Sequence, residues 1–272
     1  MHMSAATPQV MGILNVTPDS FHDGGRFVDH AAAVARVKAM VTAGADWIDV
    51  GGESTRPGAP EVSVDREIER VVPVIRAVRA AHPVLPISID TTKPAVAHAA
   101  LAAGATAVND ISALGDPEMA GIVAAAGCDL MLMHMQGTPR TMQREPRYDD
   151  VVAEVRAFLL ERVQRAVDAG VAPHRVWIDP GIGFGKTVLH NLALLHGLPH
   201  LVDTGLPVLL GASRKSFIGS VLDNPATDDR LEGSLAVASI AAWMGVAMLR
   251  VHDVQATRRA VDMAWAIRGG GV

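Results

Sequence analysis

Short apolar runs alternate with longer amphipathic segments along most of the chain. Each run consists of a few apolar or β-branched residues bounded by turn-forming residues. This pattern is typical of strands that are buried on both faces of a parallel sheet. The predicted strands are residues 10–16, 47–52, 86–90, 107–111, 129–134, 176–181, 208–213 and 248–254.

Helix-length segments separate the predicted strands. The segment 63–81 begins with a serine and an acidic first turn, and the segment 93–104 has a proline near its start and a glycine at its end. Both patterns are typical of helix boundaries. The segment 231–245 is apolar on nearly all sides, so we expect it to be buried on more than one face, either as a well-buried outer helix or as a subunit interface. The clearest helical segments are 31–44, 63–81, 93–104, 151–170 and 231–245.

Eight strands that alternate with eight helices, without a break in composition, favour a (β/α)8 TIM barrel over an open doubly wound sheet. The length of 272 residues suits one such domain spanning residues 1–272. Four strand-to-helix connections are rich in loop residues, namely 17–30, 53–62, 135–149 and 214–230. In a barrel they lie at the C-terminal ends of the strands, where active sites are found.

Composition narrows the functional classes. The net charge of −5 and the isoelectric point of about 6.1 argue against a general nucleic-acid-binding protein but leave room for a local basic pocket. The single cysteine, Cys128, begins an apolar run, so we expect a buried, unreactive thiol and no disulfide within the chain. We find no signal peptide and no apolar run long enough to span a bilayer, so a cytoplasmic protein without membrane contacts is expected.

Polar side chains occur at the C-terminal end of nearly every predicted strand. Any one of them could cap a helix or close a turn, but barrel geometry aims the whole set at a common mouth. The set comprises Asn15, Asp49, Glu53, Asp90, Asn109, Asp110, His134, Asp179, Lys215, Arg250 and His252.

The set divides by its chemistry. Asp90, Asn109 and Asp179 can accept the N–H groups of a flat heterocycle that has amide and amino edges. Cationic groups, together with Asn15, suit a polyanion such as pyrophosphate. The predicted ligand therefore has a donor-rich flat head and a phosphorylated tail. The cationic residues are Arg56, Arg214, Lys215, Arg250 and His252.

The stretch DPGIGFGKT (179–187) looks at first like a nucleotide-binding loop. A P-loop requires a glycine where Pro180 stands, and proline has no N–H to offer a phosphate. We therefore interpret the glycines as a turn that leaves a strand, with Asp179 as its functional group. Lys186 and Thr187 are then expected to be loop and helix-start residues.

Other chemistries have weaker support. His22, His134 and His252 fall in three separate connections and form no zinc-binding pair, whereas Mg²⁺ held by Asn15 and phosphate oxygens fits better, because this ion keeps few protein ligands. A serine triad lacks its G-x-S-x-G motif. Lys215 could form a Schiff base, as in barrel aldolases, and this alternative stays open.

Eight motifs in chain order together resemble the dihydropteroate synthase family over nearly the whole chain. They are GILNVTPDSFHDGG (12–25), DVGGESTRPGA (49–59), SIDTTKPAVA (88–97), VNDIS (108–112), LMHMQGTPRTMQ (132–143), DPGIGFGKT (179–187), GASRKSFIG (211–219) and RVHDV (250–254). The resemblance implies a homodimeric TIM barrel of folate biosynthesis that joins a dihydropterin diphosphate to p-aminobenzoate with release of pyrophosphate. It also implies a sulfonamide target. One departure is Ala113, where the family often has glycine.

The resemblance also implies a role for each matching residue. The expected catalytic residues are Asp23, Asp90, Asp179 and Lys215. The pterin-binding residues would be Asp90, Asn109, Met133, Asp179 and Lys215. The diphosphate would contact Asn15, Arg56, Arg250 and His252, with Asn15 also binding Mg²⁺. The p-aminobenzoate pocket would be formed by Thr55, Arg56, Pro57, Phe184, Ser213 and Lys215. Phe21 and Asp23 would close over the reacting centre.

The expected reaction is an SN1-like substitution, driven by neutralisation of the leaving pyrophosphate and by positioning of the amine. Substrates should bind in order, because the amine pocket needs loops that close around the diphosphate. Three alternatives compete with this interpretation. One is a pterin-binding methyltransferase barrel, which would not need the STRPG and SRKS motifs. The others are a Schiff-base aldolase acting through Lys215 and a non-catalytic pterin-binding protein, which should lack the cationic residues of the mouth. Sensitivity to sulfonamides stays open.

Overall fold

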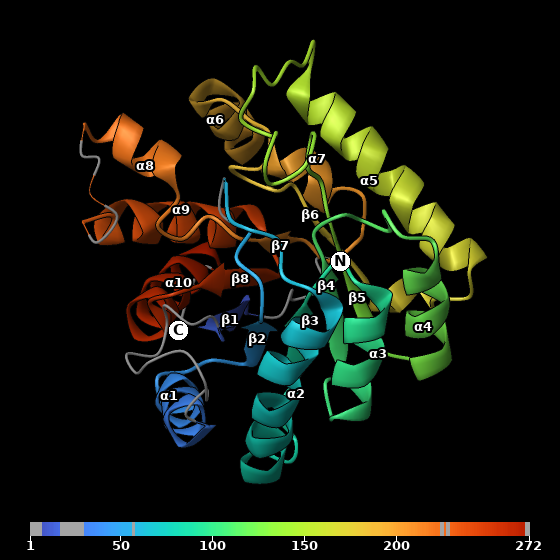
Figure 1. Cartoon of the computed structure of the whole chain (residues 1–272). Helices are drawn as coiled ribbons and strands as arrows, with labels where there is room; N and C mark the ends of the chain where they lie inside the picture. Colours follow the sequence, from blue (N-terminus) through green and yellow to red (C-terminus); the bar gives the residue numbers. More distant parts are fainter. Residues whose placement is uncertain (1–6, 17–29, 56–57, 224–225, 227–228, 270–272) are drawn as a thin grey trace.

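The computed structural model describes residues 7–16, 30–55, 58–223, 226 and 229–269. In this part of the chain eight parallel strands form one sheet in the order β6-β5-β4-β3-β2-β1-β8-β7, with helices around it (Figure 1). A parallel bridge between Ile178 and Val208 joins the two ends of this order, so the predicted barrel is confirmed. The strands are β1 (Gln9–Asn15), β2 (Trp47–Gly51), β3 (Ile87–Asp90), β4 (Ala107–Asp110), β5 (Asp129–Met133), β6 (Val176–Asp179), β7 (Leu209–Leu210) and β8 (Met248–Val251).

The helices begin and end close to the predicted residues. The side chain of Ser63 caps α2 by accepting the backbone N–H of Arg66, and α3 begins at Pro94. None of the described helices combines the length and apolar character needed to cross a bilayer. The helices are α1 (His30–Thr42), α2 (Val64–Ala81), α3 (Pro94–Ala102), α4 (Glu118–Ala126), α5 (Val151–Asp168), the 3₁₀ helix η2 (Pro173–Arg175), α6 (Val188–His196), α7 (Leu198–Val202), α8 (Ser216–Val221), α9 (Leu231–Met244) and α10 (Val254–Arg268).

Two expectations about helices were wrong. Helix α9 is buried along one stripe of small residues only, and its Ile240 and Trp243 are 52% and 50% exposed, because an outer barrel helix packs against the sheet with a single face. Helix α8 lies within the connection 214–230, which reads as a loop in the sequence. Its six residues are too few to produce a clear periodic pattern.

Cys128 behaves as expected. Its side chain is 6% exposed, and burial raises the pKa of the thiol to about 11. A thiol that stays protonated at neutral pH is a poor nucleophile, so Cys128 is a small apolar residue of the core.

The inside of the barrel is filled in two layers of different chemistry. Large apolar side chains form the layer nearer the N-terminal ends of the strands, where the rings of Trp47 and Trp177 meet edge to face at 6.3 Å. Trp177 is partly buried, and the buried members of this layer besides Trp47 are Met11, Ala107, Met131, Leu209 and Met248. Because this layer fills one end of the barrel, the opposite end is left for polar side chains.

Candidate active site

The alternation of side chains along each strand explains how polar groups enter the barrel. Residues two positions apart on a strand face the same side, so Asp49 follows Trp47 inward on β2, Asp179 follows Trp177 on β6, and Arg250 follows Met248 on β8. Each polar residue thus stands directly above a residue of the apolar layer. As a result, charged groups line the mouth of the barrel at the C-terminal ends of the strands.

Arg250 connects two carboxylates at the centre of this mouth. Its Nε donates to Asp49 Oδ2 at 2.6 Å, and its Nη2 donates to Asp90 Oδ2 at 2.7 Å. Asp49 also accepts from Ser88 Oγ at 2.5 Å and from Asn109 Nδ2 at 3.3 Å. Burial alone would lower the pKa of Arg250, but the two carboxylates outweigh it and raise the pKa above its ordinary value. The guanidinium is therefore permanently charged and fixed in place.

Two of these residues had no assigned role in the sequence. Asp49 is among the expected strand-end groups, but Ser88 is not, although both face inward on neighbouring strands. The signal that could have identified Ser88 is its spacing of two residues from Asp90, because that spacing places both side chains on the same side of β3.

Asp90 presents a buried oxygen that has no protein partner among the described residues. Its Oδ2 pairs with Arg250, whereas its Oδ1 is inaccessible to solvent and makes no hydrogen bond. Burial raises the pKa of this carboxyl to about 7, in spite of the opposing charge of Arg250. Buried acceptors are normally satisfied, so this oxygen is suited to accept an N–H group of a ligand.

Asp179 lies across the mouth from Asp90, and the glycine-rich turn holds it in place. Its Oδ1 accepts the backbone N–H of Gly181 at 2.7 Å, and burial raises its pKa despite Lys215. Gly181 has φ 66°, and a Cβ there would lie only 1.9 Å from the carbonyl oxygen of His134. Glycine is therefore required at this position, and the turn interpretation of the DPGIGFGKT stretch is confirmed.

Lys215 lies beside Asp179. Its ammonium donates to the carbonyl oxygen of Ile182 and lies 4.3 Å from the centre of the Phe184 ring, a cation–π contact. Burial lowers the pKa of Lys215 to about 8, and Asp179 opposes the change. The amine is thus still charged at neutral pH and faces the mouth together with an aromatic ring.

Two glycines leave space between the charged groups. A Cβ on Gly211 would lie 3.8 Å from Asp179 Oδ2 and 3.9 Å from the Cβ of Arg250, and a Cβ on Gly51 would lie 3.8 Å from both Asn15 Oδ1 and Asp90 Oδ2. The missing side chains leave space beside each acidic group, and the amide oxygen of Asn15 borders the space beside Asp90. We refer to this part of the mouth, between Asp90 and Asp179, as the slot.

Most of the remaining predicted site residues also lie at this end of the barrel. Met133 ends β5 and is 4% exposed, Thr55 lines a pocket with Asp90, and His252 Nδ1 lies 3.1 Å from Ser213 Oγ. The expected rim cation Arg214 makes two hydrogen bonds to Asp253, at 2.8 and 2.6 Å.

His134 does not join the mouth, so its placement there was wrong. Its ring packs 4.9 Å from the ring of Phe158 on α5, and its Nδ1 lies 2.9 Å from Lys186 Nζ. Burial lowers the pKa of His134 to about 3, with a further contribution from Lys186. Lys186 is a loop residue, as predicted, but it is also buried and donates to the carbonyl oxygen of Phe184 at 2.9 Å. Thr187 caps α6, so its prediction as a helix-start residue is confirmed.

Asp110 also points away from the mouth, because it follows the inward-facing Asn109 on β4. Its carboxylate accepts the N–H groups of Ser112 and Leu114 at 2.8 Å. The same turn holds Ala113 and Leu114 at φ 49° and 63°, a region that favours glycine. Ala113, which stands where the family often has glycine, therefore has a strained backbone. The hydrogen bonds to the carboxylate of Asp110 stabilise the turn that contains it.

Four predicted residues, Phe21, Asp23, Arg56 and Pro57, lie outside the described residues. Their expected roles in loop closure and in binding stay predictions.

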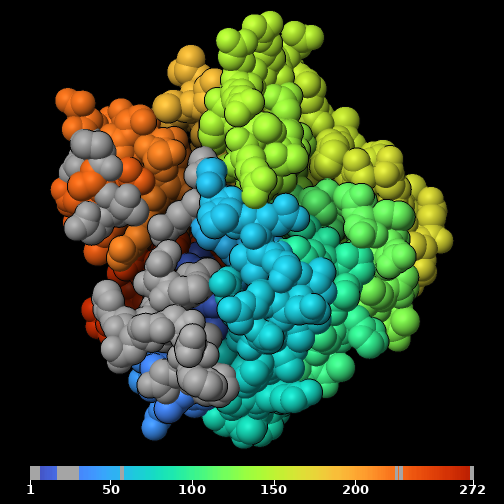
Figure 2. Space-filling model, viewed as in Figure 1, coloured from blue at the N-terminus to red at the C-terminus, as the bar shows by residue number. Residues whose placement is uncertain are grey.

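A pocket of about 540 Å³ opens beside the charged centre. It is lined by residues 53–55 after β2, 90–93 after β3, 111, 112 and 115 after β4 and 137–140 after β5, with a few neighbours. On the face drawn in Figure 2, the light-blue connection after β2 lies against the yellow-green connection after β5. The pocket reaches Asp90, which it shares with the charged centre.

Comparison with known proteins agrees with this site. Residues 11–252 match the family described as pterin binding enzyme. The chain is 50% identical over 259 residues to the dihydropteroate synthase of Escherichia coli (strain K12), covering 95% of this chain and 91% of that protein. The structure of Yersinia pestis dihydropteroate synthase with a sulfonamide drug complex superposes with a TM-score of 0.91 at 45% identity, over 99% of this chain and 100% of that one.

A further solved structure is the enzyme from Xanthomonas albilineans in complex with 7,8-dihydropteroate. It superposes with a TM-score of 0.86 at 45% identity, over 96% of this chain and 94% of that one. Both the sequence and the structural likeness extend over almost the full length of each chain. The chain therefore belongs to the pterin-binding enzymes and, within them, to the dihydropteroate synthases, which are transferases.

Proposed function

We propose that this protein makes 7,8-dihydropteroate in folate biosynthesis by joining 6-hydroxymethyl-7,8-dihydropterin diphosphate to p-aminobenzoate. The observation that carries the proposal is the buried oxygen of Asp90 without a partner among the described residues, in a mouth where the missing side chains of Gly51 and Gly211 leave space beside Asp90 and Asp179. A pterin edge has several N–H donors, and two opposed carboxylates match it. The solved relative bound to 7,8-dihydropteroate supports this assignment.

The pterin ring would lie in the slot. Asp90 and Asp179 would accept its N–H groups, Asn109 would contact it with its amide, and Met133 would pack against its face. Lys215 would donate to the ring carbonyl, since it lies beside Asp179 and is charged at neutral pH. This arrangement uses three of the inward-facing polar groups that the strands place at the mouth, namely Asp90, Asn109 and Asp179, together with Lys215 from the connection after β7.

The diphosphate would extend from the slot toward Asn15 and His252. Asn15 ends β1 beside Asp90, and its amide oxygen is a ligand type that Mg²⁺ accepts when phosphates and water supply the rest. When bound, Mg²⁺ would neutralise charge on the leaving pyrophosphate. Arg56 and Arg250 are the proposed further diphosphate contacts.

The chain's own groups would then favour an SN1-like substitution. The C–O bond breaks and its electron pair leaves with pyrophosphate, while the pterin delocalises the cation and Asp179 stabilises it electrostatically. The amine nitrogen attacks with its lone pair, forms the new C–N bond and loses one proton to solvent. Because this nitrogen is nucleophilic as it stands, the site needs positioning and not a strong base.

A product assay tests the proposed function directly. The protein is incubated with dihydropterin diphosphate, Mg²⁺ and p-aminobenzoate, and both pyrophosphate and dihydropteroate are quantified. We expect the two products in equal amounts. The absence of product above a protein-free blank would refute the proposal.

We expect kcat/KM for the dihydropterin diphosphate to fall as the pH rises through about 8. Burial lowers the pKa of Lys215 to about 8, so the amine is charged below this pH and neutral above it, and the neutral amine binds a ring carbonyl and the Phe184 ring more weakly. A pH profile of kcat/KM measures this effect. Lys215→Arg stays charged and should lose this basic limb, and an identical limb in both proteins would contradict the assignment.

We further infer that two copies of the chain associate through α9 and α10. Four large apolar side chains are about half exposed on these neighbouring helices, namely Ile240 and Trp243 on α9 and Met263 and Ile267 on α10. Large exposed apolar side chains gathered on two packed helices are typical of interaction sites, and most homo-oligomers are twofold dimers.

The association is tested by Trp243→Glu, which places a charge in the proposed interface. We expect the mass measured by light scattering to fall from that of a dimer to that of a monomer. Val84→Glu is the matched control, because Val84 is 93% exposed in the connection after α2. A wild-type protein that is already a monomer would refute the inference.

The p-aminobenzoate pocket would be formed by Thr55, Phe184, Ser213 and Lys215 with the predicted Arg56 and Pro57. Sulfonamides resemble p-aminobenzoate in shape, and a related dihydropteroate synthase has been solved with a sulfonamide drug complex. We therefore propose that sulfonamides compete with p-aminobenzoate at this pocket.

A further inference from the structure

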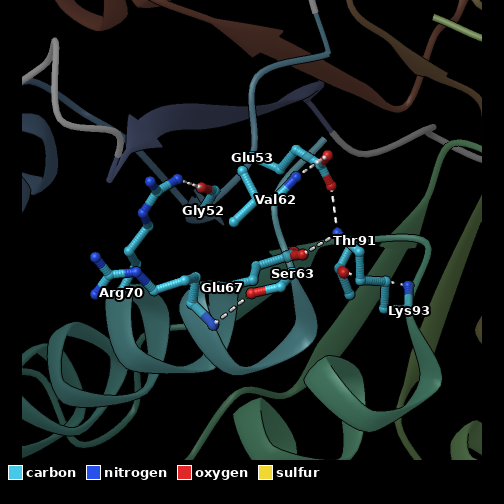
Figure 3. Close-up of polar contacts among 9 residues, drawn as sticks. Gly52, Glu53, Val62, Ser63, Glu67, Arg70, Thr91 and Lys93 are labelled. Atoms are coloured by element: carbon cyan, nitrogen blue, oxygen red, sulfur yellow. Dashed lines mark hydrogen bonds and ion pairs between the residues drawn. The ribbon is translucent and has the colours of Figure 1, made fainter. Parts of the chain in front are cut away.

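An ion cluster lies between the connections that follow β2 and β3. The ammonium of Lys93 donates to the carboxylate of Glu53, just after β2, and to Glu67 Oε2 on α2 at 2.5 Å. Figure 3 shows the three side chains converging from these separate elements. The Glu67 side chain is fully buried, while Glu53 and Lys93 are 22% and 17% exposed.

Glu53 also closes the connection that begins with it. Its Oε1 accepts the backbone N–H of Val62 at 2.9 Å, so one carboxylate holds both ends of residues 53–62. The guanidinium of Arg70 on α2 donates to the carbonyl oxygen of Gly52 at 2.8 Å. Thr55, an expected p-aminobenzoate contact, lies two residues beyond Glu53.

Backbone hydrogen bonds fix Lys93 to the pterin side of the site. It lies three residues after Asp90, its backbone N–H donates to Thr91 Oγ1 at 3.2 Å, and the N–H of Thr91 donates to the carbonyl oxygen of Asn109 at 3.2 Å. The short segment from Asp90 to Lys93 is therefore fixed to β4, which carries another expected pterin contact.

The cluster lowers the stability of the fold relative to an apolar contact in the same place, because it buries charged groups. It combines two carboxylates with one ammonium, and Glu67 Oε1 is buried without a hydrogen-bond partner among the described residues. Burying charge is expensive, and apolar side chains of similar size often give equal or greater stability. Local arrangements that cost stability tend to occur at functional sites.

We propose that Lys93 and Glu53 are positioning residues that fix the p-aminobenzoate side of the site relative to Asp90. The proposal rests on the proposed function. In this role the cluster sets the distance between Thr55 and the pterin slot, so that the amine is held in line with the reacting carbon. Small errors in such alignment have large effects on rate.

The first test is Glu53→Ala, which releases the connection but leaves the Lys93–Glu67 pair intact. We expect KM for p-aminobenzoate to rise about tenfold, while the Kd of dihydropterin diphosphate, measured by equilibrium binding, changes less than about twofold. The second test is the double variant Lys93→Met with Glu67→Gln, which avoids leaving the buried Glu67 charge unpaired. In this variant too, KM for p-aminobenzoate should rise while the Kd of dihydropterin diphosphate stays nearly unchanged.

Two controls separate positioning from general stability. Lys93→Arg keeps a cation between both carboxylates and should stay within about threefold of the wild-type KM. Arg175→Met breaks the ion pair with Asp129 at the opposite end of the barrel and should move neither constant. An unchanged KM for p-aminobenzoate in the Glu53 and Lys93 variants, or an equal weakening of both substrates, would overturn the proposal. If the wild-type protein made no dihydropteroate, the proposed function would fail instead.

Discussion

Replacing Arg250 by methionine should lower the free energy of unfolding by about 3 to 5 kcal/mol, because it leaves two buried carboxylates without their cation. Asp49 is completely buried and Asp90 is 8% exposed. Neither can recover solvation where it lies, and the hydrogen bonds that Asp49 receives from Ser88 and Asn109 offset only part of the loss. Urea unfolding followed by tryptophan fluorescence measures the change.

The matched control for this variant is Arg66→Met. Arg66 pairs with Glu69 at 2.8 Å, but both side chains are mostly exposed, so the expected loss is below about 1 kcal/mol. Adding Asp49→Asn and Asp90→Asn to Arg250→Met removes the unpaired charges and should recover part of the stability. A loss in Arg250→Met no larger than that in Arg66→Met would contradict the central role of this ion cluster.

Asp179→Asn should lower kcat/KM for dihydropterin diphosphate by about 100- to 1000-fold while the fold stays intact. The amide has nearly the same shape but no charge, and it brings an N–H group where the ligand offers its own donors. The same carboxylate would stabilise the developing pterin cation, so both binding and kcat should fall.

Equilibrium binding measures the loss of pterin affinity separately from the loss of kcat. The melting temperature shows whether the fold is intact. Asp129→Asn is the matched control, because Asp129 starts β5 at the opposite end of the barrel and pairs there with Arg175. Binding should fall only in Asp179→Asn. Unaltered pterin binding in that variant would mean that the ring lies elsewhere.

The barrel itself was predictable, because alternation of apolar runs and helices needs only local information. The strand ends were predictable for the same reason, and Asp90, Asn109, Asp179, Lys215 and Arg250 do meet at one mouth. Adjacent residues point to opposite sides of a strand, however, and no local pattern says which of two polar neighbours faces in. Asn109 and Asp110 illustrate this.

The pairing of Arg250 with Asp49 could not be predicted, because it joins residues 201 positions apart along the chain. It depends on the long-range pairing of β8 with β1, which in turn pairs with β2. The burial of Lys186 against His134 arises in the same way, from two connections that interlock after folding. The sequence left two interpretations of α9 open, a well-buried outer helix and a subunit interface, because composition alone does not distinguish a buried face from an association surface.

The seam between β6 and β7 has a consequence for motion. Among the described residues it is joined by the Ile178–Val208 bridge and by the N–H of Ile178 donating to the carbonyl of Pro207 at 3.0 Å, so it should open more readily than the other strand pairs. Asp179 stands on one side of this seam, and Gly211 and Lys215 on the other. A bound pterin would contact residues on both sides of the seam and stabilise its closed state. Slower amide hydrogen exchange along β6 and β7 would then report that the site is occupied.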